Sequence, residues 1–284
     1  MGVECDRLLL VRQVHRVDVA VARRDRVHPW VRPEADVIVS DDPSSAIGVR
    51  VADCAPVLLA DRRTHAVAAA HAGWRGTVQR AATMAVEALQ REFGSNARDL
   101  IAAIGPCLGP CCGEVGDEVV QAFRDAGHDS TAIGRWFSAG PSGRSHVDLW
   151  RANADQLEAA GVPPDQIHVA RLCTKTHADV LHSYRVLGTA AGRMVGVIRS
   201  VHAERDPGLG IRDSGLGTRD SGLGTRDSGF GARDSGLGTR DSDDVASGFS
   251  RKETRGSRKL TMPVFPAVAR RRPFQDSRVD PLPC

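Results

Sequence analysis

Aromatic residues are scarce in this sequence of 284 residues, where phenylalanine, tryptophan and tyrosine together make up 4% and tyrosine occurs once. Hydrophobic residues reach 41%, which is enough for one soluble core. Twenty-nine glycines beside so few aromatic residues indicate that part of the chain does not contribute to that core.

Long apolar runs are also missing. No stretch reaches the roughly eighteen apolar residues that a membrane-spanning helix needs. The first fifteen residues carry acids before a short apolar patch and contain no small-residue cleavage site, a pattern that does not fit a signal peptide. We therefore expect a cytoplasmic protein with no membrane partner.

An excess of one charge is absent from most of the chain. Residues 1–203 have no net formal charge, whereas residues 204–284 hold 15 basic and 12 acidic side chains and so account for the formal net charge of +3. A nucleic-acid-binding domain needs a concentrated basic surface. We expect no nucleic-acid partner.

The seven cysteines do not follow a regular disulfide pattern. Their number is odd, and Cys107, Cys111 and Cys112 lie within six positions, so reduced thiols are expected. These three neighbouring cysteines make a second metal site one alternative. The surrounding GPCLGPCC is rich in glycine and proline, which favours structural loop cysteines.

The sequence changes character near His202. Residues 208–242 are five heptads of the type GLGTRDS, each with two glycines and one large apolar residue. A coiled coil needs two apolar positions per heptad, so this period does not predict one. We expect a folded domain over residues 1–203 and a disordered, low-complexity tail over residues 204–284.

Short strands alternate with helices in residues 1–203, which predicts a single mixed α/β layered domain. A helix is predicted over 77–93, where an apolar stripe ends at Gly94. Further helices are predicted over 116–126 and 149–160. The predicted strands cover 8–14, 17–22, 37–39, 47–51, 57–60, 66–70, 100–104, 167–171 and 194–199.

Three segments carry more reactive side chains than folding requires: QVH at the end of the first strand, VADCAP between two strands, and HAGWRG after a strand of small residues. They contain His15, Cys54 and His71. One cysteine and two histidines suit zinc and leave a fourth position open, as catalytic zinc sites do. Asp53 is the candidate to orient one of these ligands. The three ligands do not have the CxxC-type spacing that marks many zinc sites.

These segments belong to a longer series. QVH, ADCAPVLLAD, HAGWRGT, IGPCLGPCCGEVG, DLWRANADQL followed by GV, CT, and SYR with GRM occur in the order typical of one family. The chain resembles the YfiH-type multicopper polyphenol oxidases, or laccase-like proteins, also described as purine nucleoside phosphorylases and peptidoglycan-editing factors. The resemblance covers Leu8 to Arg199 and implies that His15, Cys54 and His71 hold the metal ion.

The resemblance implies zinc-dependent phosphorolysis of adenosine, inosine, guanosine and S-methyl-5′-thioadenosine, with adenosine deamination as a second activity. Purine nucleosides and phosphate are then the partners, and a monomer is expected. Phosphate needs cationic groups around it, for which Arg75 and Arg185 are the candidates. Arg75 lies on a glycine-flanked turn that opens a helix, where backbone N–H groups add to the anion site.

The sequence also departs from the family pattern. The segment that usually precedes QVH is missing, Arg16 replaces the usual glycine, and Gly113 replaces an aromatic residue, so we expect a domain that is short at its N-terminus. Two alternatives follow. One is a copper-dependent laccase-like oxidase on the same ligands, although the sequence lacks the paired histidines of multicopper sites. The other is a catalytically impaired, metal-binding peptidoglycan-editing factor.

Other residues in these motifs are expected to be structural. Trp74 is expected to anchor the core, and Glu114 to lie at a helix N-terminus. Cys173 and Thr174 line the pocket by the resemblance. Surface or core roles are expected for His146, His177 and His182.

Overall fold

The structure is a computed structural model that describes residues 7–25 and 30–201. The tail expected over residues 204–284 lies outside the described residues.

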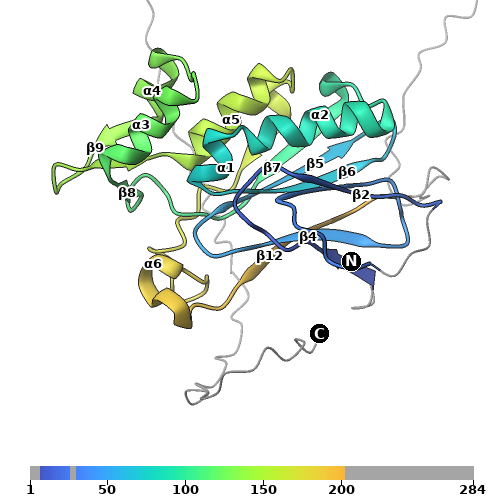
Figure 1. Ribbon diagram of the computed structural model, residues 1–284, viewed down its shortest axis with the longest axis horizontal. Coiled ribbons are helices and arrows are strands. Elements are labelled where there is room, and N and C mark those ends of the chain that lie inside the picture. The colour runs from blue at the N-terminus through green and yellow to red at the C-terminus, as the bar shows by residue number, and fades with distance from the viewer. Residues whose placement is uncertain (1–6, 26–29, 202–284) are drawn as a thin grey trace, which may run out of the picture. The chain divides into compact units, whose positions relative to one another are not determined.

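A six-stranded mixed sheet forms the centre of the domain, in the order β11, β7, β5, β6, β3, β2 (Figure 1). Strand β5 is antiparallel to both of its neighbours, β6 and β7, whereas β2 and β3 run parallel. The strand bounds are β2 Val19–Ala22, β3 Val37–Ser40, β5 Ala55–Asp61, β6 Val67–Ala72, β7 Leu100–Ile104 and β11 Ile167–Val169.

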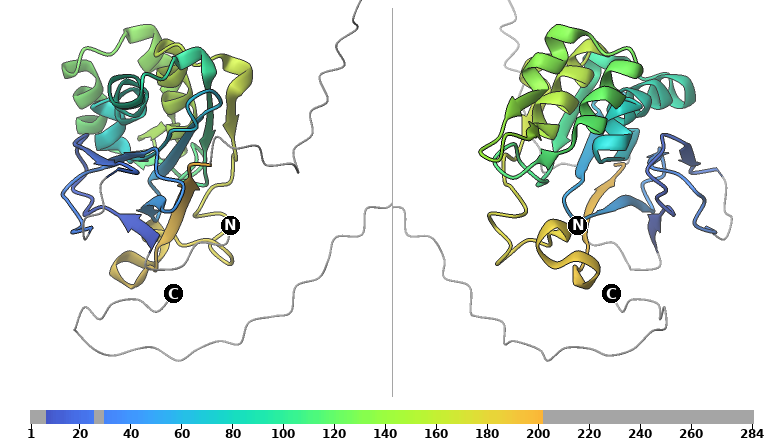
Figure 2. Two further views of the ribbon diagram at one scale, coloured as in Figure 1. Left: turned by 90° about the vertical axis from the view of Figure 1, so that its right-hand side faces the viewer. Right: turned by 60° about the vertical axis from the view of Figure 1, so that its left-hand side comes forward.

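This sheet is covered on both faces. Val37 and Val39 of β3 pack on the helix side and Ile38 packs on the opposite side, because alternate strand residues point to opposite faces. Figures 1 and 2 show helices on one side of the strands and a second sheet on the other. The helices are α1 Trp74–Val78, α2 Ala81–Phe93 and α5 Leu149–Ala159, and the second sheet has the order β1 Leu8–Leu10, β4 Ala46–Val51, β12 Met194–Arg199.

The contact between α2 and the central sheet is built from small side chains. Strand β6 reads VAAAHA and is buried along its whole length. Helix α2 turns buried alanines toward it at positions 81, 82, 85 and 88. Small residues on both surfaces let a helix lie close to a sheet, so this core needs few aromatic residues.

The aromatic residues gather in a separate part of the domain. Phe123 of α3 stacks edge to face with Trp136 of α4 and with Phe137. This part also holds a small antiparallel sheet in the order β8, β10, β9. The bounds are β8 Glu114–Val115, α3 Asp117–Asp125, α4 Ser130–Trp136, β9 Phe137–Ala139 and β10 Ser145–Val147.

The remaining elements are short. Helix α6 covers Tyr184–Leu187, and single 3-10 turns cover Ala97–Asp99, Pro164–Gln166 and Gly188–Ala190. No helix in the described ranges is long and apolar enough to cross a membrane.

The prediction of one helix over 77–93 is wrong in one respect, because the structure divides this segment between α1 and α2. Arg80 has a left-handed backbone with φ of 62° and separates the two. The carbonyl oxygen of Thr77 accepts from the side chain of Gln156, and the guanidinium of Arg80 donates to the carbonyl of Ala126. Contacts with α5 and with the end of α3 therefore hold the chain at the break between the two helices.

Candidate metal centre

Three side chains from distant segments converge at one end of the central sheet. Cys54 immediately precedes β5, and His71 lies near the end of β6, directly opposite Pro56. His15 comes from the segment between β1 and β2. The ligand atoms of the three residues all lie within 4.8 Å of one another. We call them the histidine–cysteine group, and their donor atoms could hold one metal ion.

A buried carboxylate organises two of these residues. Asp36 has no exposed surface, and its Oδ1 lies 2.7 Å from Nδ1 of His71. When Nδ1–H donates to Asp36, Nε2 of His71 keeps its lone pair for a metal, which is the usual arrangement at histidine ligands. Asp36, not Asp53, therefore orients a ligand.

The same carboxylate shapes the QVH segment. Asp36 accepts backbone N–H groups from Val14, His15 and Arg16, at 2.9 to 3.1 Å. Successive N–H groups around an anion form a nest, which stabilises backbone conformations that are otherwise unfavourable. His15 adopts such a conformation, with φ of 61°. Its position thus depends on Asp36 as much as that of His71 does.

The QVH segment is also tied to β4. The side chain of Gln13 donates to the carbonyl oxygen of Arg50 at 2.7 Å and accepts the N–H of Arg50 at 2.8 Å. This pair of bonds imitates a strand ladder. It fixes the segment before His15 against the edge of β4.

The contacts within the group favour a thiolate at Cys54 beside a protonated His71, which must release the proton on Nε2 when a metal ion binds. Burial opposes ionisation of Cys54, but hydrogen bonds from His15 and His71 outweigh it and lower the pKa of the thiol to about 7. Burial likewise opposes the charged form of His71, yet Asp36 and Cys54 raise its pKa to about 9. The polar contacts around these buried groups therefore dominate over desolvation.

The glycine of the HAGWRG segment gives the group its space. A Cβ atom at Gly73 would lie 2.6 Å from the Sγ of Cys54, which is too close for any side chain. Gly73 also precedes α1 as its N-terminal cap residue. The turn can pass over the thiol because this residue has no side chain.

Asp53 connects the cysteine to two other loops. Its backbone is left-handed, with φ of 83°, and its carbonyl accepts the N–H of Leu108. Its carboxylate accepts the hydroxyl of Thr174 at 2.5 Å and the backbone N–H of Arg185 at 2.6 Å. Asp53 therefore holds α6 and the Thr174 turn in place beside Cys54.

The histidine–cysteine group lines a cavity of about 780 Å³. This volume suits a small organic ligand. Part of the wall is apolar or aromatic, formed by Trp74, Leu108, Val115, Val147, Leu149 and Tyr184.

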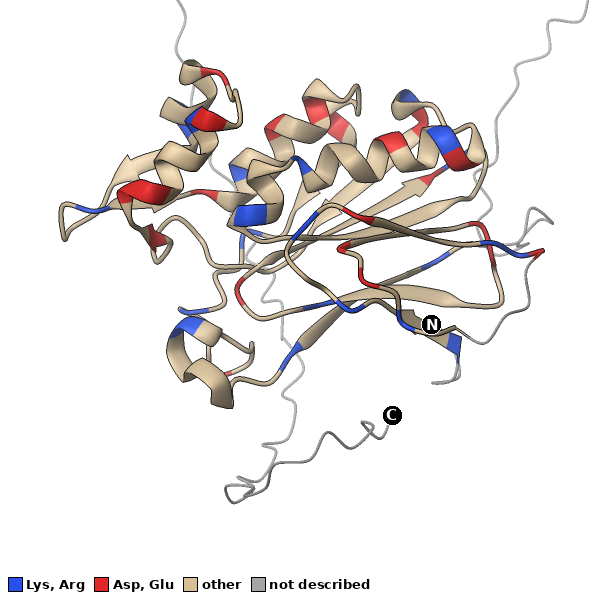
Figure 3. Cartoon of the chain, in the orientation of Figure 1, with Lys and Arg blue, Asp and Glu red and all other residues tan. Residues whose placement is uncertain are grey.

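Positive charge surrounds the same cavity. Arg75 and Arg185, singled out in the sequence, both line it, and so do Arg50 and Arg193. Figure 3 shows basic positions in α1, in α6 and at the start of β12. The guanidinium of Arg75 lies 4.2 Å from the ring centre of Trp74, and Arg185 donates to the carbonyl of Glu114 at 3.0 Å. Arg50 lies in β4, Arg75 in α1 and Arg185 in α6, and Arg193 directly precedes β12. This arrangement suits the binding of an anion from several sides.

Burial marks one of these arginines as unusual. The pKa of Arg50 is lowered, first by burial and then by the nearby charges of Arg32 and Arg193. Arg50 remains protonated, because an arginine pKa starts far above neutral pH. Like-charged groups held together in this way gain from a bound anion.

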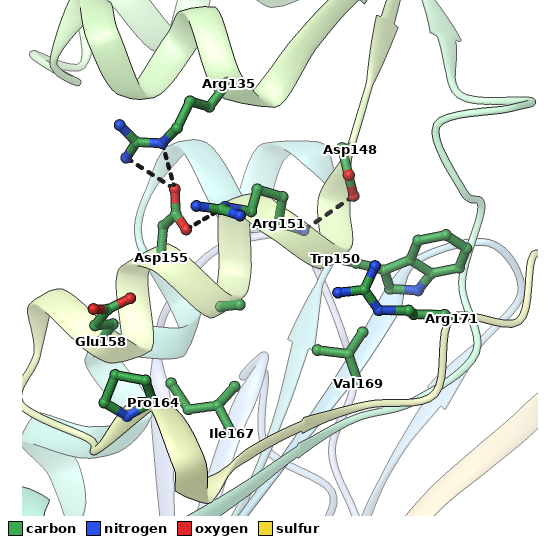
Figure 4. A pocket seen from close by; sticks show the side chains of 11 residues that line it. Arg135, Asp148, Trp150, Arg151, Asp155, Glu158, Pro164, Ile167, Val169 and Arg171 are labelled. Carbon is green, nitrogen blue, oxygen red and sulfur yellow. Dashed lines mark hydrogen bonds and ion pairs between the residues drawn. The ribbon is translucent and has the colours of Figure 1, made fainter. Parts of the chain in front are cut away.

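A second cavity, drawn in Figure 4, lies beside α5 and contains none of the predicted site residues. Three of its charged side chains pair with each other: Asp155 accepts from Arg135 at 3.0 Å and from Arg151 at 2.7 Å. The indole N–H of Trp136 donates to the same carboxylate. Because this carboxylate already has three partners, the network is a structural one.

The remaining predicted residues are spread over the domain. Trp74 packs against two of the hydrophobic clusters, as expected of a core residue. Glu114 lies in β8 and pairs with Ser142 and Arg144, not with a helix N-terminus. Thr174 does not line the cavity but bonds to Asp53.

The three other histidines have structural contacts. His146 is buried and bonds to the carbonyl of Pro110, and His177 bonds to that of Cys173. His182 packs where a side chain at Gly192 would otherwise lie, since a Cβ there would be 2.5 Å from its ring.

The cysteine loop differs from its sequence grouping. Cys107 is buried, and its backbone pairs with that of Cys173. Cys111 and Cys112 lie instead with Cys173, and the ligand atoms of these three are within 4.8 Å of one another. The cysteines in the described ranges are all free thiols, as the sequence predicts.

Asp36, Arg50 and Arg193 were not singled out as single residues from the sequence. The position of Asp36, directly before the apolar run VIV at 37–39, is a usable signal in the sequence. An acid next to a buried strand is rarely buried without a partner, so its position indicates that it has one. Arg193 stands in the GRM motif. Arg50 has no signal of its own.

The family comparison agrees with this geometry. The model of the family described as multi-copper polyphenol oxidoreductase laccase matches residues 1–200. The chain belongs to this family. The resemblance drawn from the QVH, ADC and HAGWRG motifs is thereby confirmed.

Curated relatives in this laccase family carry enzyme names. A purine nucleoside phosphorylase from Bacteroides thetaiotaomicron is 39% identical over 163 residues, which cover 57% of this chain and 60% of that protein. Adenosine deaminase RL5, from an unknown prokaryotic organism, is 39% identical over 206 residues, covering 70% and 78%. The chain thus spans about three fifths of the first relative and more than three quarters of the second.

Solved structures confirm the mixed α/β fold. The crystal structure of the Bacillus licheniformis hypothetical protein YfiH superposes with a TM-score of 0.64 at 29% identity, covering 70% of this chain and 76% of that one. The crystal structure of YlmD from Geobacillus stearothermophilus gives a TM-score of 0.61 at 29% identity, covering 69% and 74%.

Proposed function

We propose that the chain is a zinc-dependent purine nucleoside phosphorylase that acts on adenosine, inosine, guanosine and S-methyl-5′-thioadenosine, with adenosine deaminase activity. The observation that carries this proposal is the meeting of the histidine–cysteine group, four arginines and an apolar wall in one cavity. Relatives named for each activity support it.

The residues present fit a zinc ion. Two imidazoles and one thiolate are typical zinc ligands, and Asp36 orients one of them. His15, Cys54 and His71 would hold the ion. A zinc ion bound there supplies Lewis-acid chemistry next to the substrate.

The arginines bind and orient phosphate in this proposal. Phosphorolysis joins a phosphate oxygen to C1′ of the ribose while the bond from C1′ to the purine nitrogen breaks, and the base leaves with a proton. Arg75 and Arg185 are the proposed phosphate ligands, from α1 and α6 on the cavity wall. Holding phosphate beside the nucleoside supplies the proximity that the reaction needs.

The apolar wall supports a broad choice of base. Leu108, Val147 and Leu149 offer a surface for a purine ring without selecting its polar edge. Apolar contacts discriminate weakly between groups that differ by one polar atom. Adenine and guanine nucleosides are therefore both expected to bind.

A laccase-like oxidation is the alternative that the family's description suggests. Oxidation of phenols by several coppers needs several histidine-rich sites. Within residues 7–25 and 30–201, His15, Cys54 and His71 are the one group that combines histidine with cysteine. This observation favours phosphorolysis over multicopper chemistry.

The test is base release from each nucleoside, with and without phosphate, by the full chain loaded with zinc or with copper. We expect the zinc form to give base and sugar 1-phosphate in equal amounts, with 5-methylthioribose 1-phosphate as the sugar product from S-methyl-5′-thioadenosine, and no base without phosphate. Cys54→Ala should lower the rate by more than about 100-fold together with the zinc content. His168→Ala, at an exposed histidine of β11, is the matched control and should keep both.

The alternatives give different outcomes in the same assay. Oxygen consumption with phenols by the copper form, and no base release, would replace the proposal by the oxidase. Zinc binding with neither reaction would identify an impaired, metal-binding protein.

The arginine roles have a separate test. Arg75→Ala and Arg185→Ala should weaken phosphorolysis by about tenfold or more, with a raised KM for phosphate, and should largely spare deamination, which uses no phosphate. Equal loss of both reactions with zinc retained would show that these arginines support the pocket and do not bind phosphate.

A further inference from the structure

The structure brings together a second group of ligand-type side chains, Cys111, Cys112 and Cys173, which we call the three-cysteine group. Their sulfur atoms lie within 4.8 Å of one another. None of the three lines the cavity of the histidine–cysteine group. The group is therefore separate from the candidate metal centre.

We propose that the three-cysteine group is a second metal site, which binds a soft cation, Cu(I), through three thiolates. The donor set is all sulfur, whereas the first group mixes nitrogen and sulfur. Soft thiolate ligands select Cu(I) and zinc over harder cations. Three ligands complete the coordination of Cu(I), whereas a structural zinc site needs a fourth.

The spacing suits one shared ion. With a metal–sulfur distance of about 2.3 Å, three sulfurs in a plane around the ion lie about 4 Å apart. The distances in the structure, up to 4.8 Å, need a shift of less than about 1 Å to reach this value. Thiol side chains can make such a shift by small rotations about χ1.

The backbone holds the three sulfurs near each other. Cys107 and Cys173 pair as a parallel bridge, in which Thr174 donates to the carbonyl of Cys107 at 3.0 Å. The turn that carries Cys111 and Cys112 is closed by the N–H of Cys112, which donates to the carbonyl of Gly109 at 2.9 Å. Both ends of the site are therefore fixed before an ion binds.

Close packing fixes the same turn from the other side. A Cβ at Gly109 would overlap the ring of Trp150 and would lie 3.2 Å from the Cβ of Cys173. The ring of His146 bonds to the carbonyl of Pro110 at 2.7 Å. Preorganised ligands lose little conformational freedom on binding, which favours a tight site.

The exposure of the group allows an ion to enter. Cys111 is exposed, Cys112 is partly exposed and Cys173 is buried. The exposed Cys111 therefore gives an ion a route from solvent to the buried Cys173.

The test is an anaerobic titration of the reduced full chain, preloaded with zinc, with Cu(I). Cys5 and Cys284 lie outside the described residues, so a parent with Cys5→Ser and Cys284→Ser removes their thiols from the count. We expect one Cu(I) per chain, with a thiolate-to-copper absorption band and no release of the preloaded zinc. Competition with a coloured Cu(I) chelator measures the affinity.

The variants decide which sulfurs bind. Cys111→Ser and Cys112→Ser should each weaken Cu(I) retention by about tenfold or more, because two thiolates remain. Cys173→Ser should do the same; if it unfolds, the two less buried positions carry the test. Unchanged retention in Cys111→Ser and in Cys112→Ser would overturn the site.

Two further results would also overturn the proposal. If the three sulfurs bound added zinc in place of Cu(I), the assignment of Cu(I) to this site would be wrong. A disulfide would instead be identified by counting free thiols in the chain isolated without reductant. The count would be two below the expected number, reductant would restore the two thiols, and Cys111→Ser would not show this deficit. The readouts are metal content and absorption, so the outcome does not depend on the proposed reaction.

Discussion

The histidine–cysteine group and the three-cysteine group have the same number of ligands within the same separation, yet their surroundings differ. The first lies at strand ends, has a carboxylate that orients an imidazole, and opens onto a cavity. The second lies on turns, is all sulfur and does not line that cavity. Close ligands are all that the proposed Cu(I) site requires, whereas substrate chemistry also needs an oriented ligand and an adjacent binding space.

The largest expected effect is on the first group, from Gly73→Ala. The added Cβ would lie 2.6 Å from the Sγ of Cys54, so the thiol must move away from the histidines. We expect zinc content and base release to fall by about 100-fold or more, measured by elemental analysis and product chromatography. Cu(I) binding at the three-cysteine group should stay unchanged.

Gly134→Ala is the matched control for that variant. A Cβ at Gly134 meets nothing within 4 Å, and the residue lies inside α4. Alanine should raise the free energy of unfolding by about 0.5–1 kcal/mol, because it is the better helix former. If Gly73→Ala kept its zinc, steric fit around Cys54 would not be what separates the two groups.

Asp36→Asn should have the next largest effect. The amide keeps the shape but loses the charge that faces Nδ1 of His71 and the three N–H groups of the QVH segment. We expect about 10- to 100-fold weaker zinc binding. The measurement is competition with a zinc chelator, and Asp42→Asn, on a loop beside Ser44, is the control.

A result for Asp36→Asn within about twofold of wild type would contradict the orienting role of the carboxylate. The adjacent cavity would then be the one feature that distinguishes the histidine–cysteine group from the three-cysteine group. Cu(I) retention is not expected to change in either aspartate variant.

Thr174→Val should have a moderate effect, since it cuts a link between the two groups. Thr174 follows Cys173 and donates to Asp53, which precedes Cys54. Loss of one hydrogen bond to a charged group costs about 1.5–3 kcal/mol at most, so we expect kcat/KM to fall by about tenfold with zinc retained. Thr174→Ser, which keeps the hydroxyl, should keep most of the activity, and a loss in Thr174→Ser as large as that in Thr174→Val would show that the hydrogen bond to Asp53 is not sufficient for activity.

The smallest effect on base release is expected from Cys112→Ser. The residue lies in the three-cysteine group and does not line the cavity. Zinc content and kcat/KM should stay within about twofold of wild type while Cu(I) retention falls. A loss of base release as large as that in Thr174→Val would show that the two groups act as one site.

Much of the fold follows from patterns along the chain. The strands predicted over 100–104 and 194–199 match β7 and β12, and the predicted helix over 149–160 matches α5 to within one residue. In β7 and α5 the pattern follows from burial of their own apolar residues, whereas β12 pairs with β4 and is only partly buried. The elements that sequence analysis missed, such as α4 and the β8, β9, β10 sheet, are short and are stabilised by aromatic contacts between segments.

The candidate site was only partly accessible from sequence. Motifs placed His15, Cys54 and His71 together, and the structure brings their ligand atoms within 4.8 Å. The role of Asp36 was not predicted, because its partners come from β6 and from the segment before β2. The three-cysteine group was also not predicted, because the sequence groups Cys107 with Cys111 and Cys112. In the structure the backbone of Cys107 pairs with that of Cys173, and it is the sulfur of Cys173 that lies near those of Cys111 and Cys112.

The hairpin of β5 and β6 has a consequence for the order of assembly. Cys54 and His71 are 17 positions apart and are brought together when two adjacent antiparallel strands pair. Closing so short a loop has a small entropic cost, and contacts of low sequence separation form quickly in folding. His15 and its Asp36 nest require the N-terminal segment to dock on β3 and β4. We therefore expect the folding chain to make a two-ligand half of the site first and to complete it when its first strands dock.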